Sequence, residues 1–164
     1  MAERSSSVDI SISELCEEDL PFLIEVRNEC CRWLHDNREF TVEECRDWFR
    51  QCNRHFYLIR SQGVKVGYFR TSDWDMKRKS VVVGADVHKD FRRKGIGYTA
   101  YVLFADKLAA SDGIREFRLR VLEYNLKAIA LYKKLGFQVV QRGHHARGAE
   151  LIPDIEMVWR LPVG

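Results

Sequence analysis

The sequence predicts a single mixed α/β domain in which one sheet carries helices on its faces. Segments with the two-residue alternation of strands are interspersed with segments of helical spacing. The 164 residues are the length of one ordinary domain. With 46% hydrophobic and 31% charged residues, the chain has enough apolar side chains for a core and too many for a disordered protein. We expect a disordered tail over residues 1–7 and the domain over residues 8–164.

The N-terminal third predicts a strand followed by two helices. Apolar and polar residues alternate over residues 8–13, which is the period of a half-buried strand. Asp19 is a suitable N-cap for a helix over residues 20–34. Thr41 begins a second helix, because Glu44 stands three residues later and completes a capping box.

The middle of the chain predicts three strands. Residues 56–60 and 65–71 flank Ser61-Gln62-Gly63, which is a typical hairpin turn. Residues 80–87 are almost continuously apolar. Such a run is typical of a central strand that is buried on both faces.

The C-terminal half alternates helices with strands. A helix that begins near Ile96 ends at Gly113, and a helix over residues 125–135 ends at Gly136, because glycine readily adopts the left-handed conformation of helix ends. The strands expected here are residues 115–122, 137–140 and 155–161. The predicted order of elements is therefore β-α-α-β-β-β-α-β-α-β-β.

The charge balance does not indicate a nucleic-acid-binding protein. Lysine and arginine number 27 against 24 acidic residues, a net charge of +3, whereas a nucleic-acid-binding domain usually has a basic stripe. The short basic runs at residues 77–79 and 92–94 leave nucleic-acid binding as a minor alternative, which would weaken steeply with salt.

The sequence favours a cytoplasmic protein without a membrane segment. No run approaches the roughly 20 apolar residues that cross a bilayer, and the N-terminus lacks the apolar region of a secretory signal. The five cysteines are expected to be reduced thiols. The spacing of Cys45, Cys52 and His55 matches no zinc pattern, so no metal site is expected.

The segment from Val87 to Gly97 has the features of a polyphosphate site. A buried strand ends there, and a basic turn with two glycines opens a long helix. The helix start offers unpaired N–H groups and a partial positive charge, and Gly95 and Gly97 would let an anion approach the backbone. The alternative is a helix N-terminus with solvated charges. The segment matches neither the dinucleotide fingerprint nor the P-loop.

Two motifs together resemble a known family. Arg92-x-x-Gly95-x-Gly97 resembles the pyrophosphate loop of the GNAT N-acetyltransferases, which use acetyl-CoA, and Asn125-x-x-Ala128-x-x-Leu131-Tyr132-x-x-x-Gly136-Phe137 is similar to the family's next signature. The resemblance extends over residues 8–161. It implies a mostly antiparallel central sheet, splayed in the middle, with helices on both faces. The paired N-terminal helices and Trp48-Phe49 resemble the branch that acetylates ribosomal-protein N-termini, polyamines and nucleotide-linked amino sugars.

The resemblance also implies the roles of individual residues. The N–H near Val87 would bind the thioester carbonyl, the amides from Arg92 to Gly97 would hold the pyrophosphate, and Asn125 would contact the cofactor arm. The complete set expected at acetyl-CoA is Val87, Arg92, Arg93, Lys94, Gly95, Ile96, Gly97, Asn125, Tyr132 and Lys134.

Tyr132 is the expected general acid, protonating the departing thiolate. The conjugate acid of a thiolate has a pKa of about 8.5 and a tyrosine about 10, so the transfer is mildly uphill in water, and a desolvated thiolate narrows the gap. Alternatively Tyr132 is a core aromatic, because it shares a helical face with Ala128 and Leu135.

No general base can be carried over from the family. The positions at which the family often has one are Val81, Val83 and Arg120. Asp86 is the expected substitute, because apolar surroundings favour a carboxyl group that accepts a proton. The equal alternative is that Asp86 is an acid neutralised by an arginine. The other candidates are Glu123, Glu150, His144, His145 and a chain of waters.

The acceptor is expected to be a primary amine of a small molecule or a protein N-terminus. A basic loop with Arg142, His144, His145 and Arg147 favours an acceptor with an anionic group, such as a nucleotide-linked amino sugar. An acidic group with Asp36, Glu39, Glu43 and Glu44 would instead attract a cationic amine. Both groups also fit solvated surfaces.

We expect an enzyme that transfers acetyl directly, because no cysteine lies on the predicted cleft elements to form an acyl intermediate. The alternative is a non-catalytic acyl-CoA-binding sensor or interaction module, which the missing family base favours and Tyr132 opposes. Similar proteins are often dimers, which makes a homodimer an alternative to the monomer.

Overall fold

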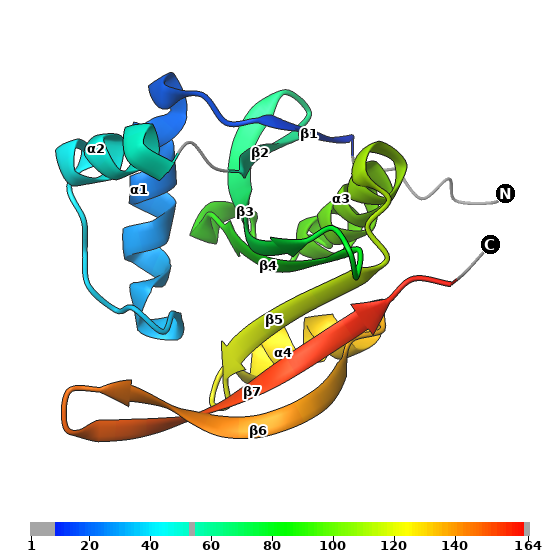
Figure 1. Cartoon of the computed structure of the whole chain (residues 1–164). Coiled ribbons are helices and arrows are strands. Elements are labelled where there is room, and N and C mark those ends of the chain that lie inside the picture. The colour runs from blue at the N-terminus through cyan, green and yellow to red at the C-terminus, as the bar shows by residue number, and fades with distance from the viewer. Residues whose placement is uncertain (1–8, 53–54, 163–164) are drawn as a thin grey trace, which may run out of the picture.

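The computed structural model describes residues 9–52 and 55–162. The predicted tail and Val8 lie outside the described residues. The described part forms a seven-stranded sheet in the order β1-β2-β3-β4-β5-β7-β6 (Figure 1). The strands are β1 (Ile10–Glu14), β2 (Phe56–Ser61), β3 (Val64–Asp75), β4 (Ser80–Val87), β5 (Glu116–Leu122), β6 (Gln138–Arg147) and β7 (Glu150–Arg160). The α-helices are α1 (Leu20–Cys30), α2 (Val42–Cys52), α3 (Ile96–Asp112) and α4 (Leu126–Leu135).

The sheet is antiparallel except where β4 meets β5. These two strands run parallel and pair only from Ser80–Val82 to Glu116–Arg118. Beyond that point β4 continues along β3, and β5 continues along β7. The predicted element order and the mostly antiparallel sheet with a splay in the middle are therefore confirmed.

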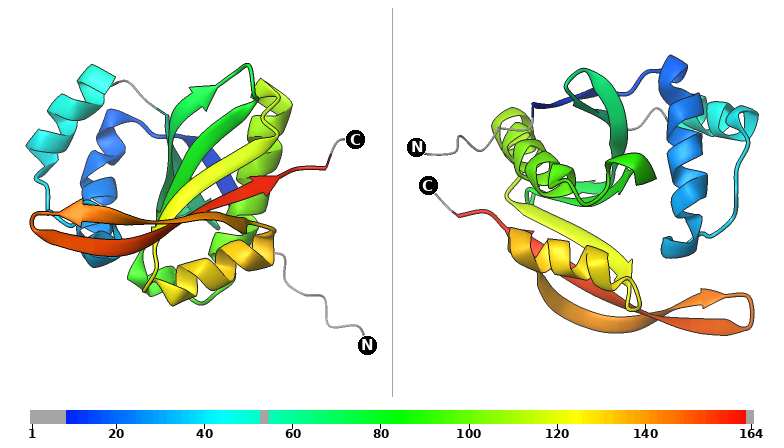
Figure 2. Two further views of the ribbon diagram at one scale, coloured as in Figure 1. Left: turned by 60° about the horizontal axis from the view of Figure 1, so that its bottom comes forward. Right: turned by 180° about the vertical axis from the view of Figure 1, so that it is seen from behind.

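Helices cover both faces of the sheet (Figure 2). Successive residues of β3 point to opposite faces, so Tyr68 joins the core beneath α1 and α2, whereas Phe69 joins the core beneath α3. The Phe69 ring stacks on Phe104 of α3, with ring centroids 4.1 Å apart. Strand β3 thus carries apolar side chains toward two cores, whereas the buried apolar residues of β4, Val81 and Val83, join only the core beneath α3. The expectation that β4 is an apolar strand buried on both faces therefore holds for one face only.

Helix α1 ends earlier than predicted. It stops at Cys30, and a 3-10 helix follows over Cys31–Trp33. The Cys31 N–H bonds to the Asn28 carbonyl, three residues back, which tightens the last turn. Because the helix ends early, Arg32 and Trp33 lie in the 3-10 helix, where they line the cleft described below.

Strands β6 and β7 are longer than predicted, so the expected basic loop is a hairpin instead. Most residues of β6 are exposed or half-buried, and they lack the apolar alternation that marks a strand. Cross-strand pairing nevertheless continues to Arg147–Glu150. Gly148 has φ +63°, the left-handed conformation that its turn requires.

The stacked pair in the main core gives a stability prediction. Phe69 is fully buried, so Phe69→Ala leaves a cavity and is expected to lower the free energy of unfolding by about 3–5 kcal/mol. Urea unfolding measures this change. Val64→Ala is the control, because Val64 is 53% exposed and should cost far less. Equal losses for the two variants would contradict the described packing.

Candidate active site

A cleft of about 720 Å³ lies at the splay of the sheet. Its walls come from the end of β4, the N-terminal half of α3, α4, and the segment at the end of α1. The predicted site residues that line it are Asp86, Val87, Arg92, Arg93, Gly95, Ile96, Gly97, Asn125, Tyr132 and Lys134. Lys94 is not part of this lining, and its Nζ lies 5.6 Å from the centre of the Phe91 ring. Residues distant in sequence are therefore brought to one cavity.

The two glycines before α3 have different structural roles. Gly95 is the N-cap residue with φ +74°, and a Cβ there would meet no atom within 4 Å. Its surface is therefore open to an anion. At Gly97, a Cβ would lie 3.3 Å from Leu131 Cδ2, so this glycine lets α3 pack closely on α4.

The Arg92 side chain is held within the protein. Its Nε donates to the Val87 carbonyl at 2.9 Å, and its Nη2 donates to Glu29 Oε1 at 2.7 Å. These bonds tie the loop to β4 and α1. A phosphate at this loop would consequently depend on backbone amides and on Arg93 or Lys134 rather than on the Arg92 guanidinium.

Tyr132 lies beside a second tyrosine that the sequence did not single out. The rings of Tyr132 and Tyr101 meet edge to face, with centroids 5.8 Å apart. Tyr101 is buried, and its hydroxyl has no hydrogen-bond partner among the described residues. Tyr101 follows Gly97 by four residues, so the two share a face of α3, and this spacing was the available signal.

Tyr132 is protonated at neutral pH. Burial raises the pKa of its hydroxyl above the ordinary value of 10.0. The ring also packs against Phe137, with centroids 5.6 Å apart. Tyr132 therefore combines the contacts of a core aromatic with a place in the cleft wall, so the two alternatives are not exclusive.

Asp86 forms a charged cluster with two residues of β3. It is 9% exposed, and its Oδ2 accepts a hydrogen bond from the Tyr68 hydroxyl at 2.5 Å. Arg70 Nη1 lies 3.5 Å from the same oxygen. A Cβ on Gly84 would lie 2.8 Å from Arg70 Nε, so the glycine makes room for the guanidinium across β4. This is the neutralised arrangement that the sequence left open, and the role of Asp86 as a base stays a prediction.

The expectation that no cysteine lies near the cleft is wrong. Cys30, the last residue of α1, lines it. The sequence could not show this, because the helix approaches from a distant part of the chain. Burial raises the pKa of the Cys30 thiol to about 12. A protonated thiol is a poor nucleophile, so direct transfer remains the favoured route.

The hairpin of β6 and β7 is anchored to the loop after α1. Asp154, 1% exposed, accepts hydrogen bonds from Arg120 Nη2 at 3.1 Å and pairs with His35 Nε2 at 2.9 Å. Arg147 Nη2 donates to the Leu34 carbonyl at 2.9 Å. His145 meets the His35 ring edge to face. Two residues of the predicted basic loop, His145 and Arg147, therefore attach the hairpin to the loop after α1.

Comparisons with known proteins agree with this geometry. The model of the acetyltransferase (GNAT) family matches residues 14–137. The chain belongs to the acetyltransferase (GNAT) family. An N-alpha-acetyltransferase of Saccharolobus solfataricus is 26% identical over 164 residues, covering 92% of this chain and 94% of the relative.

Two solved structures show the same fold. Spermidine N-acetyltransferase from Vibrio cholerae, in complex with CoA and spermine, has a TM-score of 0.84 at 14% identity and covers 92% of this chain and 95% of its own. A phosphinothricin acetyltransferase from Sinorhizobium meliloti, in complex with acetyl-CoA, has a TM-score of 0.76 at 17% identity. The match covers 93% of this chain and 88% of that protein's chain.

Family membership confirms the predicted fold class and the prediction of an acyltransferase enzyme. It does not favour the alternative of a non-catalytic module. Within residues 9–52 and 55–162, no helix has both the length and the apolar character needed to cross a bilayer.

The His35–Asp154 pair gives a prediction on pH and stability. Burial lowers the pKa of His35 below its ordinary value of 6.5, so the unfolded chain binds a proton more readily than the folded protein. The free energy of unfolding should therefore fall as the pH drops below about 6.5. Urea unfolding from pH 7 to pH 5 measures this slope.

His35→Gln removes the titrating group and should flatten the slope, whatever its effect on stability at pH 7. His144→Gln is the control, since the described residues give His144 no side-chain bond. An unchanged slope in His35→Gln would mean that another group causes the pH dependence.

Proposed function

We propose that the protein transfers acetyl from acetyl-CoA directly to a primary amine of a small molecule or a protein N-terminus. The observation that carries this proposal is the single cleft that joins the start of α3, the end of β4 and Tyr132. Family membership supports it, as does the acetyl-CoA held by the Sinorhizobium structure.

The cleft offers donors along its length for acetyl-CoA. The unpaired amides at the start of α3, around Gly95, are suited to the pyrophosphate. Asn125 precedes α4 without a side-chain capping bond, so its amide is available to the cofactor arm. Beyond Val82, β4 no longer pairs with β5, which leaves backbone groups toward Val87 for the thioester arm.

The proposed reaction forms a C–N bond and breaks a C–S bond. The neutral amine attacks the thioester carbonyl carbon, and the tetrahedral intermediate then expels the CoA thiolate. Tyr132 gives its proton to the thiolate sulfur. The nitrogen releases its remaining extra proton, which returns through water to the Tyr132 phenolate, and the products are an amide and free CoA.

Asp86 is the proposed acceptor of the proton that the ammonium must lose before attack. It lines the same cleft as Tyr132. A carboxylate in the wall of this cleft is placed to receive a proton directly or through water.

A cytoplasmic location, a homodimer and the absence of a nucleic-acid partner complete the proposal. Among the described residues, the cysteines that are free thiols are Cys16, Cys30, Cys31 and Cys45. Free thiols of this number fit a reducing compartment.

Tyr132→Phe tests the function. The variant should lose about 10²- to 10⁴-fold in turnover, because it lacks the proton for the thiolate. It should keep its affinity for acetyl-CoA, which thermal unfolding measures. At a hundredfold excess over the Kd, acetyl-CoA should stabilise the protein by roughly 2.7 kcal/mol, and ATP, the control anion, by much less.

Tyr57→Phe is the matched control, since Tyr57 lies in the core away from the cleft. A wild-type protein that acetyl-CoA does not stabilise would refute the cleft assignment. A wild type that binds acetyl-CoA but acetylates no amine would support the sensor instead.

Asp86→Asn tests the base. With the carboxylate gone, kcat/KM should fall at least about 10²-fold at neutral pH. Activity should recover partly at high pH, where the acceptor loses its proton without help. An Asp86→Asn protein that is less stable but has the wild-type pH profile would show that Asp86 serves only as a charge partner.

A further inference from the structure

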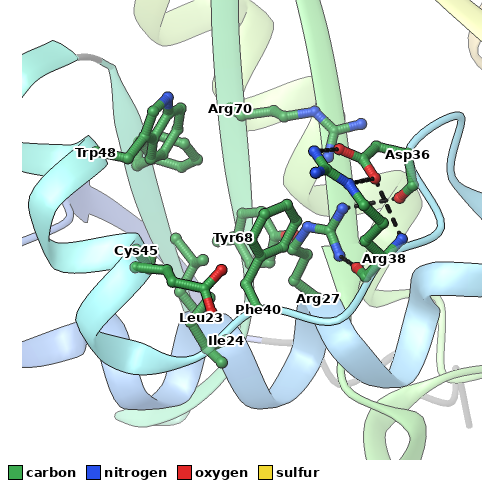
Figure 3. Close-up of a pocket in the computed structure, with 12 residues that line it drawn as sticks. Leu23, Ile24, Arg27, Asp36, Arg38, Phe40, Cys45, Trp48, Tyr68 and Arg70 are labelled. Atoms are coloured by element: carbon green, nitrogen blue, oxygen red, sulfur yellow. Dashed lines mark hydrogen bonds and ion pairs between the residues drawn. The ribbon is translucent and has the colours of Figure 1, made fainter.

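A second cavity, of about 420 Å³, lies on the sheet face that α1 and α2 cover (Figure 3). We call it the arginine pocket. Its lining is Leu23, Ile24, Arg27, Asp36, Arg38, Phe40, Glu44, Cys45, Trp48, Phe56, Tyr68 and Arg70. This volume is in the range that holds a small organic molecule.

One side of the arginine pocket is apolar. Leu23 and Ile24 of α1, Phe40, and Trp48 of α2 contribute to it. The Trp48 ring meets Phe56 edge to face at 5.2 Å but is still 45% exposed. A large aromatic surface that is open to a cavity is suited to the carbon skeleton of a ligand.

Two of the three arginines are already occupied. Arg27 donates to the carbonyls of Asp36, at 2.8 Å, and Arg38, and its guanidinium lies 4.4 Å from the centre of the Phe40 ring. Arg38 binds both oxygens of the Asp36 carboxylate, which lowers the pKa of Asp36 to about 2. These contacts hold Arg27 and Arg38 in the wall of the pocket and leave their guanidinium groups few free N–H donors for a ligand.

The acidic side chains that line the arginine pocket, Asp36 and Glu44, also make contacts within the protein. Asp36 is neutralised by Arg38, and Glu44 Oε1 accepts a hydrogen bond from the Thr41 hydroxyl at 3.2 Å. Asp36 therefore has little attraction left for a cationic amine, whereas the uncharged Thr41 hydroxyl leaves the charge of Glu44 in place.

Arg70 differs from the other two arginines. It makes no hydrogen bond to any residue that the structure describes. Its one ion pair is the 3.5 Å contact with Asp86, whose oxygen is already bonded to Tyr68. The side chain is 45% exposed, and Figure 3 shows it extending across the pocket toward Asp36. A guanidinium has several N–H donors, so Arg70 can bind an anion without breaking another bond.

The Arg70–Asp86 pair connects the arginine pocket to the cofactor cleft. Arg70 lines the first cavity and Asp86 the second. Asp86 lines the same cleft as Tyr132, and Arg70 Nη1 lies 3.5 Å from Asp86 Oδ2. A small ligand bound at Arg70 therefore lies next to a carboxylate in the wall of the cleft where the transfer is proposed to occur.

We propose that the arginine pocket binds the acceptor, and that the acceptor is a small amine with an apolar body and an acid group that pairs with Arg70. This inference rests on the proposed acetyl transfer. The acid group is a carboxylate or a phosphate, which share this chemistry. A polyamine is disfavoured, because its second ammonium would lie beside the guanidinium.

Matched acceptor pairs test the charge requirement. L-phenylalanine is compared with L-phenylalaninamide, and glucosamine 6-phosphate with glucosamine, with spermidine as the polycation. Mass spectrometry follows acetylation by acetyl-CoA. In at least one pair, the compound with the acid group should have a kcat/KM about 10- to 100-fold above that of the matched compound without it. The pair that shows the preference distinguishes a carboxylate from a phosphate.

Three variants assign the preference to Arg70. Arg70→Met should abolish it, and Arg70→Lys should keep part of it, because lysine retains the charge without the planar fork. Gly84→Ala leaves every charge in place, but its Cβ displaces the guanidinium. It should therefore weaken the preference as well. All three variants should retain the thermal shift with acetyl-CoA.

Calorimetry with CoA-saturated protein measures binding of the same compounds independently of turnover. The inference would be overturned if the compounds without the acid group, or spermidine, had an equal or higher kcat/KM. An unchanged preference for the acid group in Arg70→Met would also overturn it. Binding of none of the acids to the CoA-saturated protein would also overturn it. Failure of the proposed function is distinct, because the wild type would then either show no thermal shift with acetyl-CoA or show the shift and acetylate no amine.

Discussion

The end of pairing between β4 and β5 is the constraint on which the site depends. The strands share only the pairs from Ser80–Glu116 to Val82–Arg118 and then diverge. Backbone donors and acceptors need partners, so a strand edge that opens inside a sheet offers a ligand the bonds that a neighbouring strand would make. Helices α3 and α4 follow the two diverging strands, and their N-termini reach the same cleft. The splay thus creates the cavity and brings the binding groups to it.

The central strand separates two different chemical environments. On the α3 side, residues such as Val83 are buried in an apolar core. On the other side, Gly84 leaves room for Arg70, and Asp86 bonds to Tyr68. Because side chains alternate along a strand, one short segment supplies both the rigid support and the polar surface. In the proposed function, the cofactor and the acceptor would therefore approach β4 from different directions.

Local signals in the sequence were sufficient for most elements of the fold, whereas the residues expected at the cofactor came from the resemblance to the family. Gly113 and Gly136 end their helices in the left-handed conformation, as predicted, because that conformation is a property of the glycine itself. The loop around Gly95 was recognisable for the same reason. Cys30 and Arg70 were not found, since their roles come from contacts with Arg92 and Asp86 across the fold. The length of the hairpin was not predicted, because its half-buried positions Gly143, His145 and Arg147 are not apolar and so give no alternation in the sequence.

The burial of Tyr132 fits a proton transfer between two desolvated groups. In water the tyrosine is the weaker acid, with a pKa of about 10 against about 8.5 for a thiol. Burial raises the pKa of Tyr132 further, which keeps its proton in place while acetyl-CoA and the amine bind. A thiolate formed in the same cleft is desolvated too, and its affinity for a proton rises for the same reason. In the proposed reaction, Tyr132 therefore keeps its proton until the C–S bond breaks, and the desolvated CoA thiolate is then a base strong enough to take it.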